Sequence, residues 1–142
     1  MAKIKSYTDL EQSKKLAEIL PLESADMIYI MYHNGEKPQN DDANLSTVYE
    51  SDDHKWYWVD IIDGSWDMRI GEDIPCWSLA VLLKLLPQKI EYEGHEAELH
   101  INSRMTDIWY ENDNFIYFGT FAEELIDACV QLICTLNEKN LL

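Results

Sequence analysis

The chain has 142 residues, with 11 basic and 27 acidic side chains, so its formal net charge is −16. Such a surface repels nucleic-acid phosphates and anionic lipid, because affinity for both comes largely from Lys and Arg. Hydrophobic residues make up 46% of the chain and include five Trp and eight Tyr, enough for a core without metal or disulfide. These figures predict one folded, acidic domain over residues 1–142 that binds no nucleic acid directly.

Membrane insertion and secretion are not expected from the sequence. The most apolar stretch, Ile74–Leu83, contains Pro75 and is shorter than the roughly 20 residues that span a bilayer. The basic start lacks the apolar run of a secretory signal. The three cysteines have no C-x-x-C spacing, which favours reduced thiols in the cytoplasm.

The first half of the chain predicts a helix followed by strands. Thr8-Asp9-Leu10-Glu11 has the form of a capping box and predicts a helix over about 9–20. Residues 26–32 predict a buried strand, and a polar loop, a candidate mobile segment, is expected at about 33–54. Residues 55–62 predict a strand, with its hairpin partner at 66–70.

The second half predicts a helix, a meander and a final helix. Ser78 is a plausible N-cap for an apolar helix that ends before Pro87. Residues 89–118 predict four short antiparallel strands, with apolar and polar residues alternating over 96–101. A second capping box, Thr120 to Glu123, predicts an amphipathic helix over about 121–138 whose apolar arc begins with Phe121. The fold class is therefore α+β, with about three helices packed on a mainly antiparallel sheet.

Three sequence patches carry a resemblance. They are Tyr7–Leu16, Ser24–Met27, and Ile74–Leu79 together with Leu85-Leu86-Pro87. With the C-terminal helix, they resemble a family of short uncharacterised proteins from Bacteroidetes genomes that are often associated with prophages or mobile elements. The family has no known activity, so the resemblance implies a genomic context and no catalytic residues.

Motifs for catalysis and metal binding are weak. His95 and His100 are five residues apart, not the four that the zinc-protease helix motif needs, and on a strand they point to opposite faces. Cys76, before a predicted helix start, is a candidate for a lowered pKa. Cys129 is expected in the core, and Cys134 is the most reachable thiol. We therefore predict no catalytic residue, metal or cofactor.

The candidate ligand or interaction patch lies at 52–60. On a strand, Trp56, Trp58 and Asp60 share one face, where exposed aromatics could grip a sugar or a partner. Asp52, Asp53 and His54 precede them and could add oxygen and nitrogen ligands. The competing interpretation is that a helix covers the Trp side, because aromatic strand residues are usually core.

The leading functional hypothesis is a non-enzymatic accessory protein of phage or mobile-element type that binds a protein partner with a basic surface. A special case is a DNA mimic, which needs carboxylates in a stripe about 20 Å long or longer. One alternative is a small ligand-binding or hydrolytic domain that uses the 52–60 region. Another is a homo-oligomeric subunit, such as a homodimer, that packs through the apolar helix Leu79–Leu86.

Overall fold

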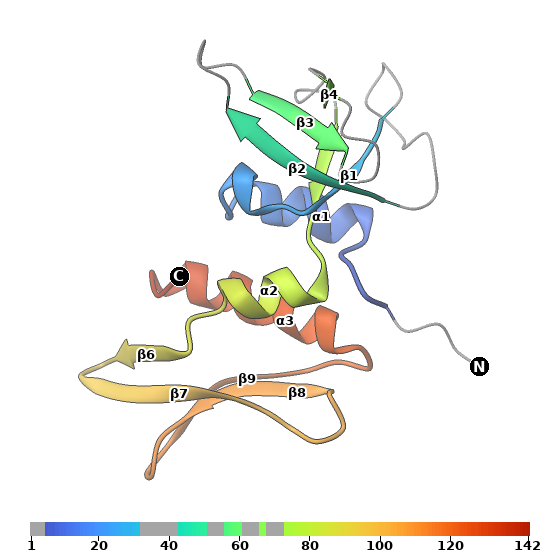
Figure 1. The fold of residues 1–142 in the computed structure, drawn as a ribbon. Coiled ribbons are helices and arrows are strands. Elements are labelled where there is room, and N and C mark those ends of the chain that lie inside the picture. Colours follow the sequence, from blue (N-terminus) through green and yellow to red (C-terminus); the bar gives the residue numbers. More distant parts are fainter. Residues whose placement is uncertain (1–4, 32–42, 51–55, 61–65, 68–72) are drawn as a thin grey trace. The chain divides into compact units, whose positions relative to one another are not determined.

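The computed structural model describes residues 5–31, 43–50, 56–60, 66–67 and 73–142 (Figure 1). Within them, three α-helices and two antiparallel sheets confirm the expected α+β class, including the C-terminal meander followed by a helix. The chain divides into two compact units. We call residues 7–81 the N-terminal unit, and residues 82–142 together with residues 1–6 the C-terminal unit. No helix in the described ranges is long and apolar enough to cross a membrane.

The N-terminal unit is built on a five-stranded antiparallel sheet in the order β4-β3-β2-β1-β5. Helix α1 packs against β5, and Met27, Tyr29, Met31 and Cys76 form a buried cluster. The elements of this unit are α1 (Leu10–Ala17), the 3-10 turn η1 (Leu22–Ser24), β1 (Met27–Tyr29), β2 (Asn44–Glu50), β3 (Trp56–Asp60), β4 (Trp66–Asp67) and β5 (Ile74–Cys76).

Helix α1 begins one residue later than the capping box at Thr8 predicts. Asp9 is the N-cap: its Oδ1 accepts a hydrogen bond from Gln12 N at 2.8 Å, and Gln12 Oε1 accepts one from Asp9 N at 3.0 Å. Thr8 is fully buried, so its hydroxyl serves the interior instead of the helix end. The helix ends at Ala17, three residues before the expected Leu20.

Thr8 is the centre of a buried hydrogen-bond network. Its Oγ1 lies 2.8 Å from Ser13 Oγ and accepts a hydrogen bond from Trp77 N at 3.2 Å. Its backbone oxygen accepts from Tyr29 Oη at 2.8 Å and from Cys76 Sγ at 3.3 Å. One threonine thereby joins the start of α1, β1 and the end of β5.

The expectation of a polar loop over about 33–54 is wrong in part. Strand β2 occupies Asn44–Glu50 and pairs with β3 in a register that runs from Ser46 opposite Asp60 to Glu50 opposite Trp56. The remainder of that loop, except Ala43, lies outside the described residues. The strand expected at 55–62 is confirmed as β3, and β4 is its predicted hairpin partner.

The C-terminal unit consists of a four-stranded meander with a helix on one face. Its sheet has the order β6-β7-β8-β9, all antiparallel, and α3 packs on β8 and β9 (Figure 1). Its elements are β6 (Lys89–Tyr92), β7 (His95–Ile101), β8 (Asp107–Glu111), β9 (Ile116–Phe121) and α3 (Leu125–Glu138), and α2 (Leu79–Leu85) spans the boundary between the units.

Helix α2 has the expected N-cap. Ser78 Oγ accepts a hydrogen bond from Val81 N at 3.3 Å. Leu82 is the one fully buried residue of this helix in the described structure, and its other leucines are half-buried.

Helix α3 starts later than the second capping box predicts, so that prediction is wrong. Thr120 and Phe121 belong to β9, where they pair with Ile108 and Asp107. Thr120 Oγ1 donates to Ala128 O at 2.9 Å, which ties the strand to the helix. Sheet pairing thus takes these residues, and Phe121 is 67% exposed instead of opening the apolar arc. The rest of that arc, from Leu125 to Leu136, is buried as expected.

Candidate functional site

The predicted site at 52–60 lies only in part within the described residues. Asp52, Asp53 and His54 lie outside the described residues. Trp56, Trp58 and Asp60 lie at alternate positions of β3, which confirms that they share a strand, but their side chains are outside what the structure describes. The exposed aromatic patch at these residues therefore stays a prediction.

The positions of the three cysteines test the expectations about reactive thiols. Cys76 is buried in a strand, and burial raises its pKa, so the expected lowering at a helix start is wrong. Cys129 is fully buried in α3 as expected, with its pKa raised by burial to about 12, while Cys134 is half-buried. No group of three or more His, Cys, Asp or Glu among the described residues is placed to hold a metal ion.

His95 and His100 do lie on opposite faces of β7. The His95 ring lies 5.9 Å from the Phe115 ring, whereas His100 stacks on Trp109 at 5.9 Å and 15°. Ala97, which shares the face of His95, is buried. The alternation therefore separates a face that points towards α3 from an opposite face.

That opposite face of the sheet carries charged side chains from three of its strands, and we call it the outer face. Residues directly opposite in neighbouring strands share a face, so the registers define its members. They are Lys89, Glu91, Glu96, Glu98, His100, Asp107, Trp109, Glu111, Ile116, Gly119 and Phe121. From β6 to β9 the side chains change from charged to apolar.

Four glutamates form the acidic half of the outer face. Glu91 lies opposite Glu96 and Glu98 lies opposite Glu111, so two like-charged pairs are adjacent. Strands are about 4.8 Å apart and a two-residue step is about 6.8 Å, which places the Cα atoms of the four glutamates within roughly 10 by 7 Å. Like charges this close repel, so their energy is lowered by any cation that binds between them.

The acidic half already holds one cation, Lys89. Its Nζ lies 3.4 Å from Glu96 Oε1 and 3.7 Å from Glu98 Oε1. The hydrogen bond to Glu96, with the charges of both glutamates, raises the pKa of Lys89. The largely exposed ammonium of Lys89 therefore lies in the negative potential of this face.

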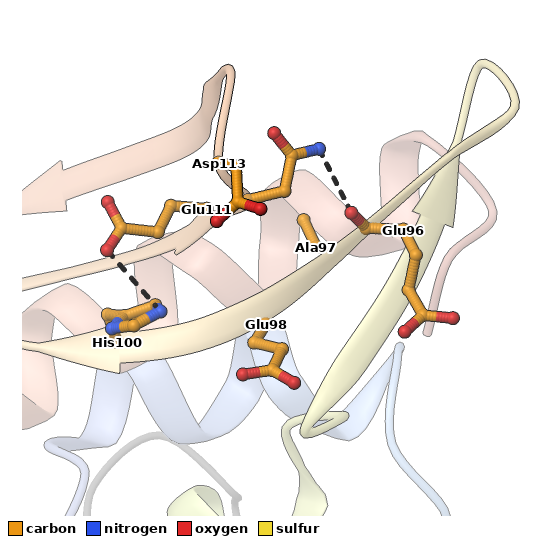
Figure 2. Close-up of a pocket in the computed structure, with 7 residues that line it drawn as sticks. Glu96, Ala97, Glu98, His100, Glu111 and Asp113 are labelled. Atoms are coloured by element: carbon orange, nitrogen blue, oxygen red, sulfur yellow. Dashed lines mark hydrogen bonds and ion pairs between the residues drawn. The ribbon is translucent and has the colours of Figure 1, made fainter.

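Residues of β7, β8 and the turn after β8 surround a hollow of about 370 Å³ (Figure 2). His100 Nε2 lies 3.5 Å from Glu111 Oε1, and Asn112 Nδ2 donates to Glu96 O at 3.0 Å. Asn112 Oδ1 also accepts from the backbone N–H groups of Asn114 and Phe115, both at 2.9 Å, which fixes the turn. These hydrogen bonds fix the turn after β8 and tie it to β7, the strand that carries Glu96 and Glu98.

The apolar half of the outer face comprises Trp109, Ile116 and Phe121. Ile116 is 69% exposed and Phe121 67% exposed, although both are large apolar side chains in a strand. Together with Gly119 and with Asp107, Ile108 and Thr120 they line a second, shallow hollow of about 270 Å³. The indole N–H of Trp109 is buried and has no hydrogen-bond partner among the described residues.

Chemically, this face can bind cationic and apolar groups. Ionised carboxylates only accept hydrogen bonds, so their partners are ammonium, guanidinium or N–H donors. None of the outer-face side chains is a Ser, Thr or Cys that could act as a nucleophile. The arrangement is suited to recognition.

Part of this site follows from sequence alternation. The run from Glu96 to Ile101 predicts a strand with Ala97, Leu99 and Ile101 on one side, which leaves Glu96, Glu98 and His100 on the other. The apolar half was missed because Phe121 was assigned to a helix. The alternation of Asp107, Trp109 and Glu111 with buried neighbours is the signal that identifies it.

No family model matches the chain, and no match to it was found among the curated proteins or the solved structures.

Proposed function

We propose that this chain is a non-enzymatic protein-binding protein whose outer face docks on a basic surface of a partner protein. One observation carries the proposal: an acidic half and an exposed apolar half lie side by side on one rigid sheet face. Interfaces commonly combine aromatic or aliphatic anchors with charges that orient the partner. The accessory role in a phage or mobile element is a further part of the proposal and depends on the resemblance alone.

The electrostatics support a basic partner. A net charge of −16 attracts a basic protein at long range, and the four clustered glutamates give that attraction a local target. The contact of Lys89 with two of them is of the kind that a cationic side chain of a partner would make, which supports the proposal. A partner Lys or Arg would add the same type of charge-assisted hydrogen bond.

The geometry favours protein docking over DNA mimicry. A mimic needs rows of carboxylates spaced along some 20 Å or more, comparable with the charge spacing of duplex DNA. The acidic half instead fits within roughly 10 by 7 Å and ends in an apolar patch. An apolar patch has no counterpart in a phosphate backbone.

The test uses variants of equal net charge. Glu98→Gln/Glu111→Gln removes two charges from the outer face, and Glu123→Gln/Glu138→Gln removes two exposed charges near the two ends of α3. Each protein is immobilised and used to capture partners from lysate at low and high salt, and affinities for any retained protein are then measured with purified components. We expect the outer-face variant to bind about tenfold more weakly, as two exposed ion pairs imply.

The matched variant should bind as the wild type does. If both variants weaken binding equally, net charge and not the outer face is responsible, and the proposal is wrong. If the wild type retains no basic protein at either salt concentration, the protein-binding function itself is wrong.

A further inference from the structure

The hollow in the apolar half is lined by a glycine, Gly119, that the stability of the sheet does not require. Gly119 lies within strand β9, at a position where a side chain would be expected. A Cβ atom on Gly119 would meet only Trp109 Cβ, at 3.9 Å, which is ordinary contact. The backbone of Gly119 is not in the left-handed region that favours glycine. A side chain is therefore sterically possible here, and its absence keeps the hollow open.

Glycine inside a strand weakens the strand, and it often marks a place where another chain or a ligand comes close. The walls of this hollow, Ile116 and Phe121, expose about two-thirds of their area at 69% and 67%. At about 270 Å³ the hollow is smaller than the roughly 300–1,000 Å³ of small-molecule pockets. Its size and apolar lining therefore suit one protein side chain better than a free ligand.

The charged neighbours of the hollow indicate what accompanies that side chain. Glu111 lies directly opposite Ile116 at the rim, and Glu98 lies opposite Glu111 on the next strand. By the strand spacing and the two-residue rise, their Cα positions are about 7 and 8 Å from that of Trp109 in the wall of the hollow. Asp107 lines the hollow itself, and its Oδ2 already accepts a hydrogen bond from Asn102 Nδ2 at 2.9 Å. An extended segment also advances about 6.6 Å in two residues, so its residue two positions away reaches these carboxylates.

We infer that the hollow beside Gly119 is an anchor pocket for one large aliphatic side chain of an extended basic segment, with a Lys or Arg two residues away bound by Glu111 and Glu98. This inference rests on the proposed function and specifies its partner. Charge complementarity selects a basic segment, since a second copy of this chain would bring its own net charge of −16. Anchors of this kind usually dominate the binding energy of an interface.

The test uses the full chain and three nine-residue peptides with blocked ends. The first is Gly-Thr-Lys-Thr-Lys-Thr-Leu-Thr-Gly, the second has Gly in place of Leu, and the third has Gln in place of both Lys. Dissociation constants are measured by titration calorimetry at low salt. We expect the wild type to bind the first peptide about tenfold or more tightly than either of the others, because each lacks one half of the recognition.

Filling the hollow should abolish the preference for Leu. Gly119→Val is expected to weaken binding of the first peptide about tenfold and to leave the already weak second peptide unchanged. Gly119→Ala, which fills less space, should have a smaller effect. Valine favours strands, so the fold should persist, and circular dichroism checks this.

Removing the charge of Lys89, which occupies the acidic half, should strengthen binding of the first peptide. Lys89→Gln frees Glu96 and Glu98 and should tighten binding of the first peptide severalfold, whereas Lys84→Gln, an equal charge change on α2, should do much less.

The outcomes separate the pocket from the function. If wild-type protein binds the Leu and Gly peptides equally, or if folded Gly119→Val binds as the wild type does, the anchor pocket is wrong. If in that case the Glu98→Gln/Glu111→Gln variant still binds its partner more weakly than the wild type does, the proposed function holds. If the wild type binds the Lys and Gln peptides equally, the basic-partner function is wrong as well. Should Gly119→Val not fold, the peptide comparison on the wild type decides.

Discussion

The two units of this protein are stabilised in different ways. All three polar or charged residues that the structure describes as buried, Thr8, Ser13 and Asp73, belong to the N-terminal unit. The C-terminal unit buries mainly the apolar residues of α3 and of the sheet, and none of its described charged side chains is buried. The N-terminal unit therefore adds a buried hydrogen-bond network to its apolar core, whereas the described interior of the C-terminal unit is almost entirely apolar.

This difference determines where each unit can tolerate change. Buried polar groups must be bonded, so a network such as the one at Thr8 constrains every residue that takes part in it. An apolar interior constrains only volume and shape, and it leaves the opposite sheet face free to carry other residues. The outer face thus belongs to the unit whose stability does not depend on its polar groups.

The largest expected effect comes from the apolar interior of the C-terminal unit. Leu132→Ala deletes a fully buried side chain from α3 and should lower the free energy of unfolding by about 2–5 kcal/mol, through lost burial and a residual cavity. Urea unfolding followed by circular dichroism measures this loss. The neighbouring Gln131→Ala, on the exposed side, should change stability by less than about 0.5 kcal/mol. Equal effects at the two positions would contradict the account of α3.

A smaller loss is expected in the N-terminal unit, from its hydrogen bonds. Thr8→Val keeps the size of the side chain but leaves Trp77 N and Ser13 Oγ without this partner, which should cost about 1–3 kcal/mol. Ser13→Ala removes the other end of the same bond. In the double variant the losses should fall short of their sum by about 0.5 kcal/mol or more, because the bond can be lost only once. Strictly additive losses in urea unfolding would mean that the network is not energetically coupled.

The sequence predicted the C-terminal unit better than the N-terminal one, and the reason is physical. The spacing of apolar and polar residues predicts which side of a strand or helix is buried and which is exposed. Both α3 and β7 have one buried and one exposed side. The alternation at Glu96–Ile101 therefore predicted both the strand and its exposed carboxylates. The start of the last helix, from Thr120 to Glu124, was assigned wrongly, since a capping box and a strand end look alike without knowledge of the pairing partner.

The N-terminal unit was less readable because its decisive contacts are far apart in the chain. Thr8 and Trp77 are separated by 69 residues, and nothing local shows that their atoms are bonded. Thr8 and Asp9 are both good N-cap residues, and the burial of Thr8 leaves that role to Asp9. The same long-range burial raises the pKa of Cys76, where helix proximity alone suggested the opposite.

The smallest expected effect concerns the pH dependence of the apolar interior. Burial raises the pKa of Cys129 from 9.0 to about 12, so the folded protein keeps a proton that the unfolded chain releases near pH 9. The stabilisation from the neutral thiol is therefore complete below pH 9 and is lost as the pH rises above it. Between pH 8 and pH 10 this one group should lower the free energy of unfolding by about 1 kcal/mol.

The control for this effect is Cys129→Ala, which removes the titrating group and keeps the others. Tyr110, whose pKa is also raised by burial, contributes equally to both proteins and cancels in the comparison. Urea unfolding of each protein at pH 8 and pH 10 should show a stability loss that is smaller in the variant by about 1 kcal/mol. If the two losses are equal, the thiol is accessible to water in the folded state, and the interior of the C-terminal unit is less dry than its apolar composition implies.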